Sequence, residues 1–239
     1  MKTTTARRLL HLNRRFYDTF AAEFAASRSA LQPGIVRALG RIGVTDVLLD
    51  VGCGDARVGR ALAAGQIPHA SARHYVGVDS SPAMLGQTVL PGSELVVADF
   101  SREGWTRQIA RSYDAVVCFS ALHHLPGPRR RLRLLRDLHG LLRPGGWLAI
   151  SVWQFLHVPR LRRKIVPWRS VGLSADDVDE SDYLLDWQRG GRGLRYVHQF
   201  EESELIGLCH KAGLAVHECF RSDGETGDMG LYVLARKPA

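Results

Sequence analysis

Three carboxylates that each follow an apolar run are the side chains best suited to chemistry in this chain. Asp50 leads into the turn Gly52-Cys53-Gly54, and Asp79 and Asp99 each end a later apolar run. Glycines in such a turn let backbone N–H groups approach a ligand closely. One carboxylate can accept two hydrogen bonds from ribose hydroxyls, and another can accept one from an adenine amino group. The pattern predicts a nucleoside site, although a tight turn and helix caps would use the same residues.

The apolar runs alternate with helical segments, and this alternation puts the carboxylates at strand ends. Continuous apolar runs are typical of strands buried on both faces of a parallel sheet, whose carboxyl edge binds ligands. The order of segments predicts an α/β fold with a doubly wound, mostly parallel, seven-stranded sheet. The expected strands cover residues 47–51, 75–79, 94–99, 113–120, 147–153, 215–221 and 231–236, and the main expected helices cover 58–64, 128–142 and 201–212.

Two segments lie outside this alternation. Residues 1–40 predict an N-terminal helical cap, although the basic residues before Tyr17 are also compatible with a transit peptide. Residues 154–199 have no clean periodicity and predict an inserted lid over the carboxyl edge of the sheet. We expect residues 1–239 to form one domain. The helical apolar stripe of the cap consists of Leu9, Leu10, Leu12, Phe16, Phe20 and Phe24.

The composition indicates an ordinary globular chain with an excess of basic residues. Of the 239 residues, 45% are hydrophobic and 23% are charged, which excludes disordered and collagen-like classes. No apolar stretch is long enough to predict a membrane span. The formal charge of +8 makes a polyanion such as RNA a reasonable partner. The four cysteines form no C-x-x-C pair, so we expect no metal site and a reducing compartment, the cytoplasm.

Two common phosphate-binding patterns do not fit the glycine turn. The dinucleotide fingerprint G-x-G-x-x-G needs a different spacing from that of Gly52, Gly54 and Gly59, and no G-K-[ST] loop is present. A series of motifs instead resembles, in order, those of the class I S-adenosylmethionine-dependent methyltransferases. These motifs lie in residues 47–54, 75–85, 96–100, 114–125 and 142–152. One departure is Asp55-Ala56-Arg57, where many members of that family continue with a third glycine.

The resemblance implies S-adenosylmethionine as the cofactor and assigns its contacts by motif position. It implies that the glycine turn lies against the methionine part, that Asp79 holds the ribose, and that Asp99 with Phe100 meets the adenine. Ser120 and Ala121 fall where the loop after the fourth strand passes the methionine and ribose. The residues implied to bind the cofactor are Tyr17, Asp50, Gly52, Cys53, Gly54, Asp79, Ser80, Met84, Asp99, Phe100, Ser120 and Ala121.

Shorter motifs are more closely similar to the eukaryotic wobble-uridine tRNA methyltransferases, which esterify 5-carboxymethyluridine. These motifs are Phe16-Tyr17-Asp18, Ser27-Arg28, the turn at 52–57, Leu122-His123-His124-Leu125, and the segments 182–187 and 195–200. Asp186 stands where that family has proline. The resemblance implies tRNA as a partner, and it implies Arg28, His124, Arg195 and His198 as substrate-side catalytic candidates. It leaves open whether this chain needs a small activator subunit, which the eukaryotic enzymes use.

Several alternatives remain open at the level of sequence. A small-molecule O-, N- or C-methyltransferase would share the fold, and a non-catalytic member could act as an activator. Basic residues in 153–170 and in the helix at 128–142 could bind a phosphate backbone, unless the acids at 176–186 pair with them. One of His123 and His124 is expected to be structural. The alternation at 195–200 predicts a strand with two distinct faces.

Overall fold

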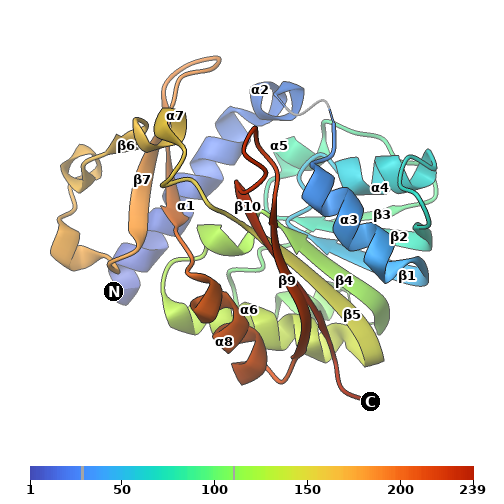
Figure 1. Ribbon diagram of the computed structural model, residues 1–239. Helices are drawn as coiled ribbons and strands as arrows, with labels where there is room; N and C mark the ends of the chain where they lie inside the picture. The colour runs from blue at the N-terminus through green and yellow to red at the C-terminus, as the bar shows by residue number, and fades with distance from the viewer. Residues whose placement is uncertain (28–29, 110) are drawn as a thin grey trace.

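The computed structural model describes residues 1–27, 30–109 and 111–239, and these contain the predicted seven-stranded sheet (Figure 1). The strand order is β3-β2-β1-β4-β5-β10-β9. The first five strands in this order pair in parallel, and β10 is antiparallel to both of its neighbours, so the mostly parallel sheet is confirmed. The strands are β1 (Val44–Val51), β2 (Ser71–Asp79), β3 (Glu94–Val97), β4 (Tyr113–Phe119), β5 (Leu142–Trp153), β9 (Ala215–Ser222) and β10 (Gly230–Arg236).

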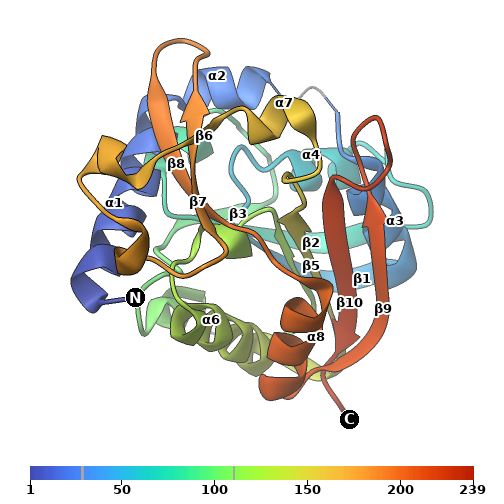
Figure 2. The ribbon, with the colours of Figure 1, turned by 60° about the vertical axis from the view of Figure 1, so that its left-hand side comes forward.

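Helices cover both faces of this sheet (Figures 1 and 2). One face packs against α3 (Pro33–Ile42) and α4 (Arg57–Ala63), and the other packs against α6 (Pro128–Leu141) and α8 (Glu202–Lys211). Successive strand residues alternate between the two cores, with Leu48 in the first and Leu49 in the second. A strand buried on both faces must be apolar throughout, which explains the continuous runs in the sequence.

The lid segment, residues 154–199, contains a second sheet rather than an irregular loop. Its strands β6 (Ile165–Val166), β7 (Asp182–Trp187) and β8 (Gly193–His198) pair antiparallel in the order β6-β7-β8. Short helical turns precede and follow β6: α7 (Pro159–Arg162), η3 (Trp168–Val171) and η4 (Ala175–Asp177). The alternation expected at 195–200 is present in β8, because the Tyr196 hydroxyl and His198 Nδ1 both contact Asp182 whereas the Arg195 guanidinium contacts aromatic rings. All six residues of 195–200 are buried, so neither face of this segment is exposed to water.

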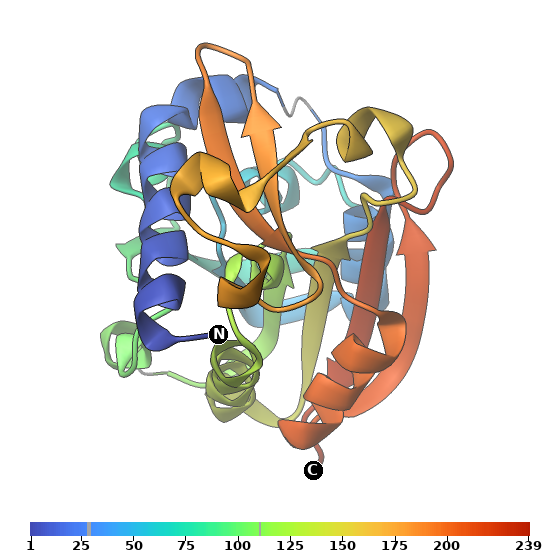
Figure 3. The same ribbon diagram turned by 90° about the vertical axis from the view of Figure 1, so that its left-hand side faces the viewer.

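The N-terminal helices connect the lid segment to the main sheet. α1 (Thr3–Thr19) runs beside β8 (Figure 3) and is followed by α2 (Ala21–Ala26). Asn13 Nδ2 donates to the Tyr196 carbonyl at 3.0 Å, and Asn13 Oδ1 accepts from the Tyr196 N–H at 2.8 Å. At its C-terminal end, α1 places Asp18 Oδ1 2.6 Å from the Ser81 hydroxyl, before the short helix α5 (Pro82–Leu85). α1 is therefore hydrogen-bonded both to β8 of the lid segment and to the residue that caps α5, just after β2.

Among the residues that the structure describes, no helix combines the length and the apolar character needed to span a lipid bilayer.

Candidate active site

The carboxyl ends of β1, β2 and β4 open into a cavity of about 770 Å³, and α1 forms its opposite wall. The twelve residues predicted to contact a cofactor all line this cavity: Tyr17, Asp50, Gly52, Cys53, Gly54, Asp79, Ser80, Met84, Asp99, Phe100, Ser120 and Ala121. These residues come from four different strand ends and two helices, with Tyr17 in α1 and Met84 in α5. The cavity therefore lies where an open α/β sheet is expected to bind a ligand.

The glycine turn after β1 is held close to two neighbouring segments. The N–H groups of Gly52 and Cys53 donate to the Val78 carbonyl at 2.7 and 3.1 Å. Gly52 has a φ of +76°, and a Cβ atom there would lie 2.5 Å from the Cβ of Ala121. Only glycine fits this position, because the turn needs both a positive φ and a close approach. At Gly52 the turn therefore presents only its backbone to the cavity.

Ala56 adopts the left-handed conformation that a glycine would adopt without strain. Its φ is +52° and its ψ is +34°, and its side chain is fully buried before α4. A left-handed L-residue costs roughly 1–2 kcal/mol. The segment Asp55-Ala56-Arg57 thus keeps the backbone path of a third glycine even though its sequence departs from that pattern.

We expect Ala56→Gly to change the free energy of unfolding by less than about 1 kcal/mol. Relief of the strained φ is offset by the lost methyl burial and by greater freedom of the unfolded chain. Ala56→Val should destabilise the fold by about 2–4 kcal/mol, because a β-branched side chain is both strained at positive φ and too large. Urea unfolding measures both changes. Equal stability of the valine variant and the wild type would contradict the left-handed assignment.

Asp79 is fixed by backbone N–H groups at the end of β2. Its Oδ2 accepts from the Gly54 N–H at 2.9 Å, and its Oδ1 accepts from the Ser81 N–H at 2.9 Å. Burial raises the pKa of this carboxyl, while the hydrogen bonds from Ser81 and Gly54 oppose the rise. Each carboxylate oxygen retains further lone-pair capacity. Asp79 can therefore accept a pair of hydroxyls without losing its own anchors.

Asp99 lines the cavity, but its carboxylate already has several donors. Oδ1 accepts from the N–H and the hydroxyl of Ser101, and Oδ2 lies 3.1 Å from nitrogens of both Arg14 and Arg102. The Ser101 contacts have the form of a local turn, which is one of the alternatives that the sequence leaves open. An adenine amino group would have to share or replace the arginine contacts.

Asp50 is buried beneath the glycine turn and is hydrogen-bonded to one phenol. The Tyr75 hydroxyl donates to Asp50 Oδ2 at 2.7 Å, and the residue is only 2% exposed. Burial raises the pKa of Asp50 to about 7, against the lowering effects of the Tyr75 hydrogen bond and of the Arg57 charge. The folded protein therefore holds a proton here across a pH range in which an unfolded carboxyl has already lost it.

We expect this carboxyl to make the fold less stable as pH rises from about 4 to about 7. The unfolded carboxyl loses its proton near its pKa of about 3.9, whereas the folded carboxyl keeps its proton until about pH 7. The free energy of unfolding therefore falls with pH across that window and then levels off. The total change is at most about 4 kcal/mol by this linkage. Chemical unfolding of wild type and Asp50→Asn at several pH values measures it. Asp46→Asn, on the exposed side of β1, is the control. Parallel curves for wild type and Asp50→Asn would refute the assignment.

His124 and Tyr17 form a hydrogen-bonded pair at the cavity wall. His124 Nδ1 lies 3.0 Å from the Tyr196 carbonyl, which can only accept, so Nδ1 carries a proton. Nε2 lies 2.7 Å from the Tyr17 hydroxyl. A neutral His124 then accepts the Tyr17 proton at Nε2. His124 is thus the member of the histidine pair that lines the cavity, and His123 is fully buried against Trp153.

Arg195 lies behind this wall and not among the residues that line the cavity. Its guanidinium is 5% exposed and sits 4.8–5.7 Å from the ring centroids of four aromatic side chains, Phe16, Phe24, Trp153 and Trp187. Burial lowers its pKa, and the neighbouring Tyr17 opposes that effect. Within the described residues, its Nε and Nη1 atoms have no hydrogen-bond partner. Arg195 is a positive charge directly behind the Tyr17 phenol.

His198 is not at the cavity, which corrects its expected place on the substrate side. Its Nδ1 lies 2.8 Å from Asp182 Oδ1, and its Nε2 lies 3.1 Å from Glu204 Oε2, so both ring nitrogens face carboxylates. Asp182 belongs to β7 and Glu204 to α8, so His198 joins the lid segment to the main fold. Arg28, the fourth candidate, lies outside the described residues.

Other cavity residues were not predicted from the sequence. Arg14 and His11 come from α1, Arg57 comes from α4, and Arg130 and Arg133 come from the start of α6. Arg14, Arg130 and Arg133 have only the sequence signal of a basic run, which surface helices also have. Arg57 lies in the Asp55-Ala56-Arg57 segment after the glycine turn. Within the described residues, no cluster of three or more histidine, cysteine, aspartate or glutamate side chains could hold a metal ion. Burial raises the pKa of Cys53 well above its usual value, so this cavity-lining thiol is not a ready nucleophile.

Comparisons with known proteins show which families this chain resembles. Residues 49–148 match the family model described as a methyltransferase domain. The tRNA (carboxymethyluridine(34)-5-O)-methyltransferase of Arabidopsis thaliana is 30% identical over 139 residues, which cover 58% of this chain and 32% of that protein. The chain therefore spans about a third of the length of this curated relative.

Two solved structures share the fold across nearly the whole chain. The 1,6-didemethyltoxoflavin-N1-methyltransferase of Burkholderia thailandensis, solved with bound S-adenosylhomocysteine, has a TM-score of 0.64 at 19% identity, and the match covers 98% of this chain and 91% of that one. A chain of the complex between the Haloferax volcanii Trm112 methyltransferase activator and a methyltransferase has a TM-score of 0.64 at 17% identity. That match covers 95% of this chain and 97% of that one. At these identities the likeness is one of fold.

Proposed function

We propose that this chain, which is an S-adenosylmethionine-dependent methyltransferase with the class I fold, methylates a carboxymethyl group on a tRNA wobble uridine or a related RNA group. The observation that carries the proposal is one cavity that is lined both by a nucleoside acceptor and by a wall with a buried cation behind it. Asp79 is the acceptor, and Arg195 lies behind Tyr17 and His124 in the wall. The name of the Arabidopsis relative supports the same acceptor.

The residues of the cavity fit the proposed cofactor. Gly52 and Gly54 leave their backbone close to it, and Asp79 keeps lone pairs for the two ribose hydroxyls. When bound, S-adenosylmethionine supplies an electrophilic methyl group on a sulfonium, so the protein must chiefly align the acceptor and exclude water. Tyr17 and His124 are candidates for this alignment because their hydrogen bond fixes both side chains at the cavity wall.

A carboxylate acceptor needs little chemical activation by this site. A carboxylate is already a nucleophile at neutral pH, so no general base is needed for its attack. His124 uses both nitrogens for hydrogen bonds, which suits it for holding Tyr17 in place. A positive charge near an anionic acceptor favours its binding in a site of low dielectric constant. The Arg195 guanidinium provides that charge from behind Tyr17.

The test is to supply methyl-labelled cofactor together with either total tRNA or a small-molecule extract. We expect label in the tRNA fraction, and we expect mild alkali to release it as methanol, because a carboxyl methyl ester hydrolyses whereas N-, C- and ether-methyl groups do not. The reaction is run with and without a Trm112-type activator subunit, which the Haloferax complex suggests. Asp79→Ala should abolish the label and Asp46→Ala should keep it. Alkali-stable label in tRNA, or label only in small molecules, would contradict the proposed acceptor.

A further inference from the structure

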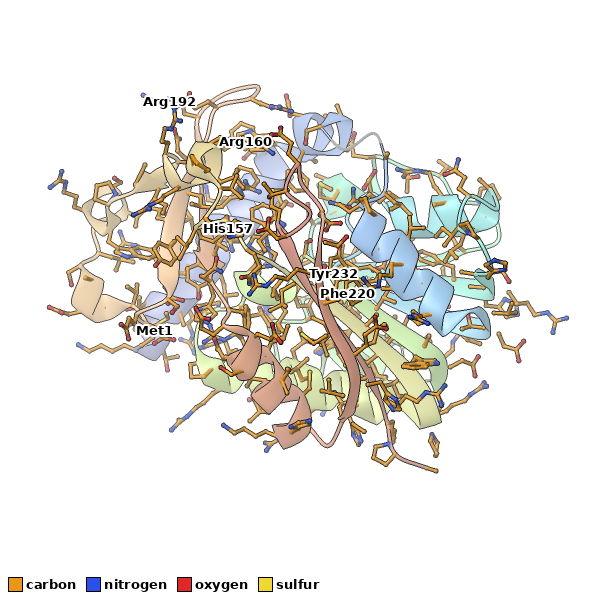
Figure 4. The ribbon with its side chains drawn as sticks, in the orientation of Figure 1. Met1, His157, Arg160, Arg192, Phe220 and Tyr232 are labelled. Carbon is orange, nitrogen blue, oxygen red and sulfur yellow. The ribbon has the colours of Figure 1, made fainter. Side chains whose placement is uncertain are left out.

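The lid segment brings together basic side chains from two separate stretches of sequence. Residues 160–164 follow each other around α7, and residues 188–192 form the turn between β7 and β8. The Asp186 N–H donates to the Lys164 carbonyl at 2.8 Å, which joins the two stretches. Figure 4 shows Arg160 and Arg192 at the same end of the molecule. We call this surface the lid basic face, and it consists of Arg160, Arg162, Arg163, Lys164, Arg189 and Arg192, all exposed.

The cations of the lid basic face have no carboxylate partners among the described residues. Arginines elsewhere are commonly paired, as in Arg37 with Glu218 at 2.5 Å and Arg60 with Asp55 at 2.6 Å. Partial burial lowers the pKa of Lys164, and the charges of Arg195, Arg189 and Arg160 lower it further. The positive groups therefore lie close enough to repel one another. Bound anions would relieve this repulsion.

Three acids of the lid segment, Asp177, Asp179 and Asp182, bind elsewhere and do not pair with the lid basic face. Asp179 pairs with the N-terminal amine at 3.3 Å and lies near Arg131. Asp182 binds His198, and Asp177 accepts from Ser174. The carboxylates that do lie near the lid basic face are Asp186, whose charge acts on Lys164, and Glu23, whose side chain packs near Gly190. Six cations against these two carboxylates leave the face strongly positive.

The lid basic face is connected to the cavity by a single strand. β8 runs from the 188–192 turn to Tyr196, whose carbonyl lies 3.0 Å from His124 Nδ1. The four residues from the end of the turn to Tyr196 span roughly 13 Å at about 3.3 Å per residue. A free small-molecule acceptor in the cavity cannot bridge that distance, whereas a polynucleotide can. The separation therefore favours a polymeric anion as the ligand of this face.

We propose that the lid basic face binds the phosphate backbone of the RNA whose acceptor group enters the cavity. This inference rests on the proposed function and adds the surface on which that RNA is held. Each lysine or arginine that contacts a phosphate releases a counterion, so binding through this face must depend steeply on salt. The acceptor itself is recognised in the cavity, and the face supplies affinity and orientation.

The test compares two variants that remove the same charge from different places. The lid variant carries Arg160→Gln, Lys164→Gln and Arg192→Gln. The control carries Arg73→Gln, Arg107→Gln and Lys211→Gln, which are exposed cations outside the lid segment that form no ion pair within the described residues. Binding of tRNA is measured at several salt concentrations by fluorescence anisotropy. Each lost phosphate contact should lower the slope of log K against log salt by about 0.7–0.9.

We expect the lid variant to lose about two units of that slope and at least tenfold in tRNA affinity, while the control stays within threefold of wild type. S-adenosylmethionine affinity should be unchanged in both. Equal slopes for the two variants would overturn the inference, as would binding of wild type to phosphatidylserine vesicles but not to tRNA. If wild type methylates tRNA and the lid variant binds tRNA as wild type does, the proposed function stands and RNA binding by the lid basic face is refuted. If tRNA binding depends on the lid basic face but no methylation occurs, RNA binding by the face stands and the proposed function is refuted.

Discussion

Replacing Asp79 with alanine is expected to weaken the binding of S-adenosylmethionine by about 10- to 150-fold. A hydrogen bond to a charged group contributes about 1.5–3 kcal/mol, and each 1.4 kcal/mol corresponds to a factor of ten in affinity. Asp79 is the acceptor proposed for the ribose hydroxyls, and it also binds the N–H groups of Gly54 and Ser81. The substitution removes both the ligand contact and two anchors of the cavity floor. Isothermal titration calorimetry measures the dissociation constant.

Two further variants separate the ligand contact from a general disturbance of the sheet. Asp79→Asn should also weaken binding, because an amide has one oxygen and cannot accept from both Gly54 and Ser81. Asp46→Ala removes an exposed carboxylate from the neighbouring strand and should leave affinity within twofold of wild type. A dissociation constant for Asp79→Ala within threefold of wild type would move the ribose site elsewhere in the cavity.

The cofactor side of the site could be predicted from sequence because each of its parts is local. A strand, its terminal carboxylate and the following turn lie within a few consecutive residues, as in the segment from Asp50 to Gly54. Parallel strands then bring all such ends to one edge, so the fold predicts that Asp50, Asp79 and Asp99 gather around one cavity. Even the departure at Ala56 preserves the backbone conformation of the motif.

The acceptor side could not be predicted in the same way because its partners are distant in sequence. Arg131 lies in a basic run that could bind phosphate, yet it is 2% exposed and its Nη2 lies 3.5 Å from Glu204 Oε1. Asn13 binds Tyr196, which is 183 residues away. No periodicity identifies such pairs, since a buried arginine or asparagine has the same sequence pattern as an exposed one. His198 is a further case, because its partner Asp182 lies 16 residues away on another strand.

A buried charge network connects the lid segment to the main fold through Asp182. Its Oδ1 accepts from the Tyr196 hydroxyl at 2.6 Å and lies 2.8 Å from His198 Nδ1. Burial alone would lower the pKa of His198, but hydrogen bonds to Asp182 and Glu204 raise it above its usual value, with the Arg131 charge opposing. The histidine is therefore held as a cation between two carboxylates, and removing one of them leaves an incompletely compensated buried charge.

We expect Asp182→Asn to lower the free energy of unfolding by about 3–5 kcal/mol, the cost of breaking a buried ion pair by removing one partner. For a chain of this size that loss lowers Tm by roughly 6–20 °C. A histidine with a raised folded pKa stabilises the fold fully below about pH 6.5, and this contribution is lost as pH rises through the folded pKa. The difference between wild type and variant should therefore be larger at pH 6 than at pH 8. Differential scanning calorimetry at both pH values measures it.

The matched control is Asp176→Asn, which removes an exposed carboxylate from the same lid segment and should shift Tm by less than about 2 °C. S-adenosylmethionine affinity should stay within a fewfold of wild type in both variants below their unfolding temperatures, because neither residue lines the cavity. A Tm loss for Asp182→Asn no larger than for the control would mean that the carboxylate does not hold His198 as a cation. A loss that is equal at pH 6 and pH 8 would assign the destabilisation to the Tyr196 hydrogen bond and to packing, and not to the charge of His198.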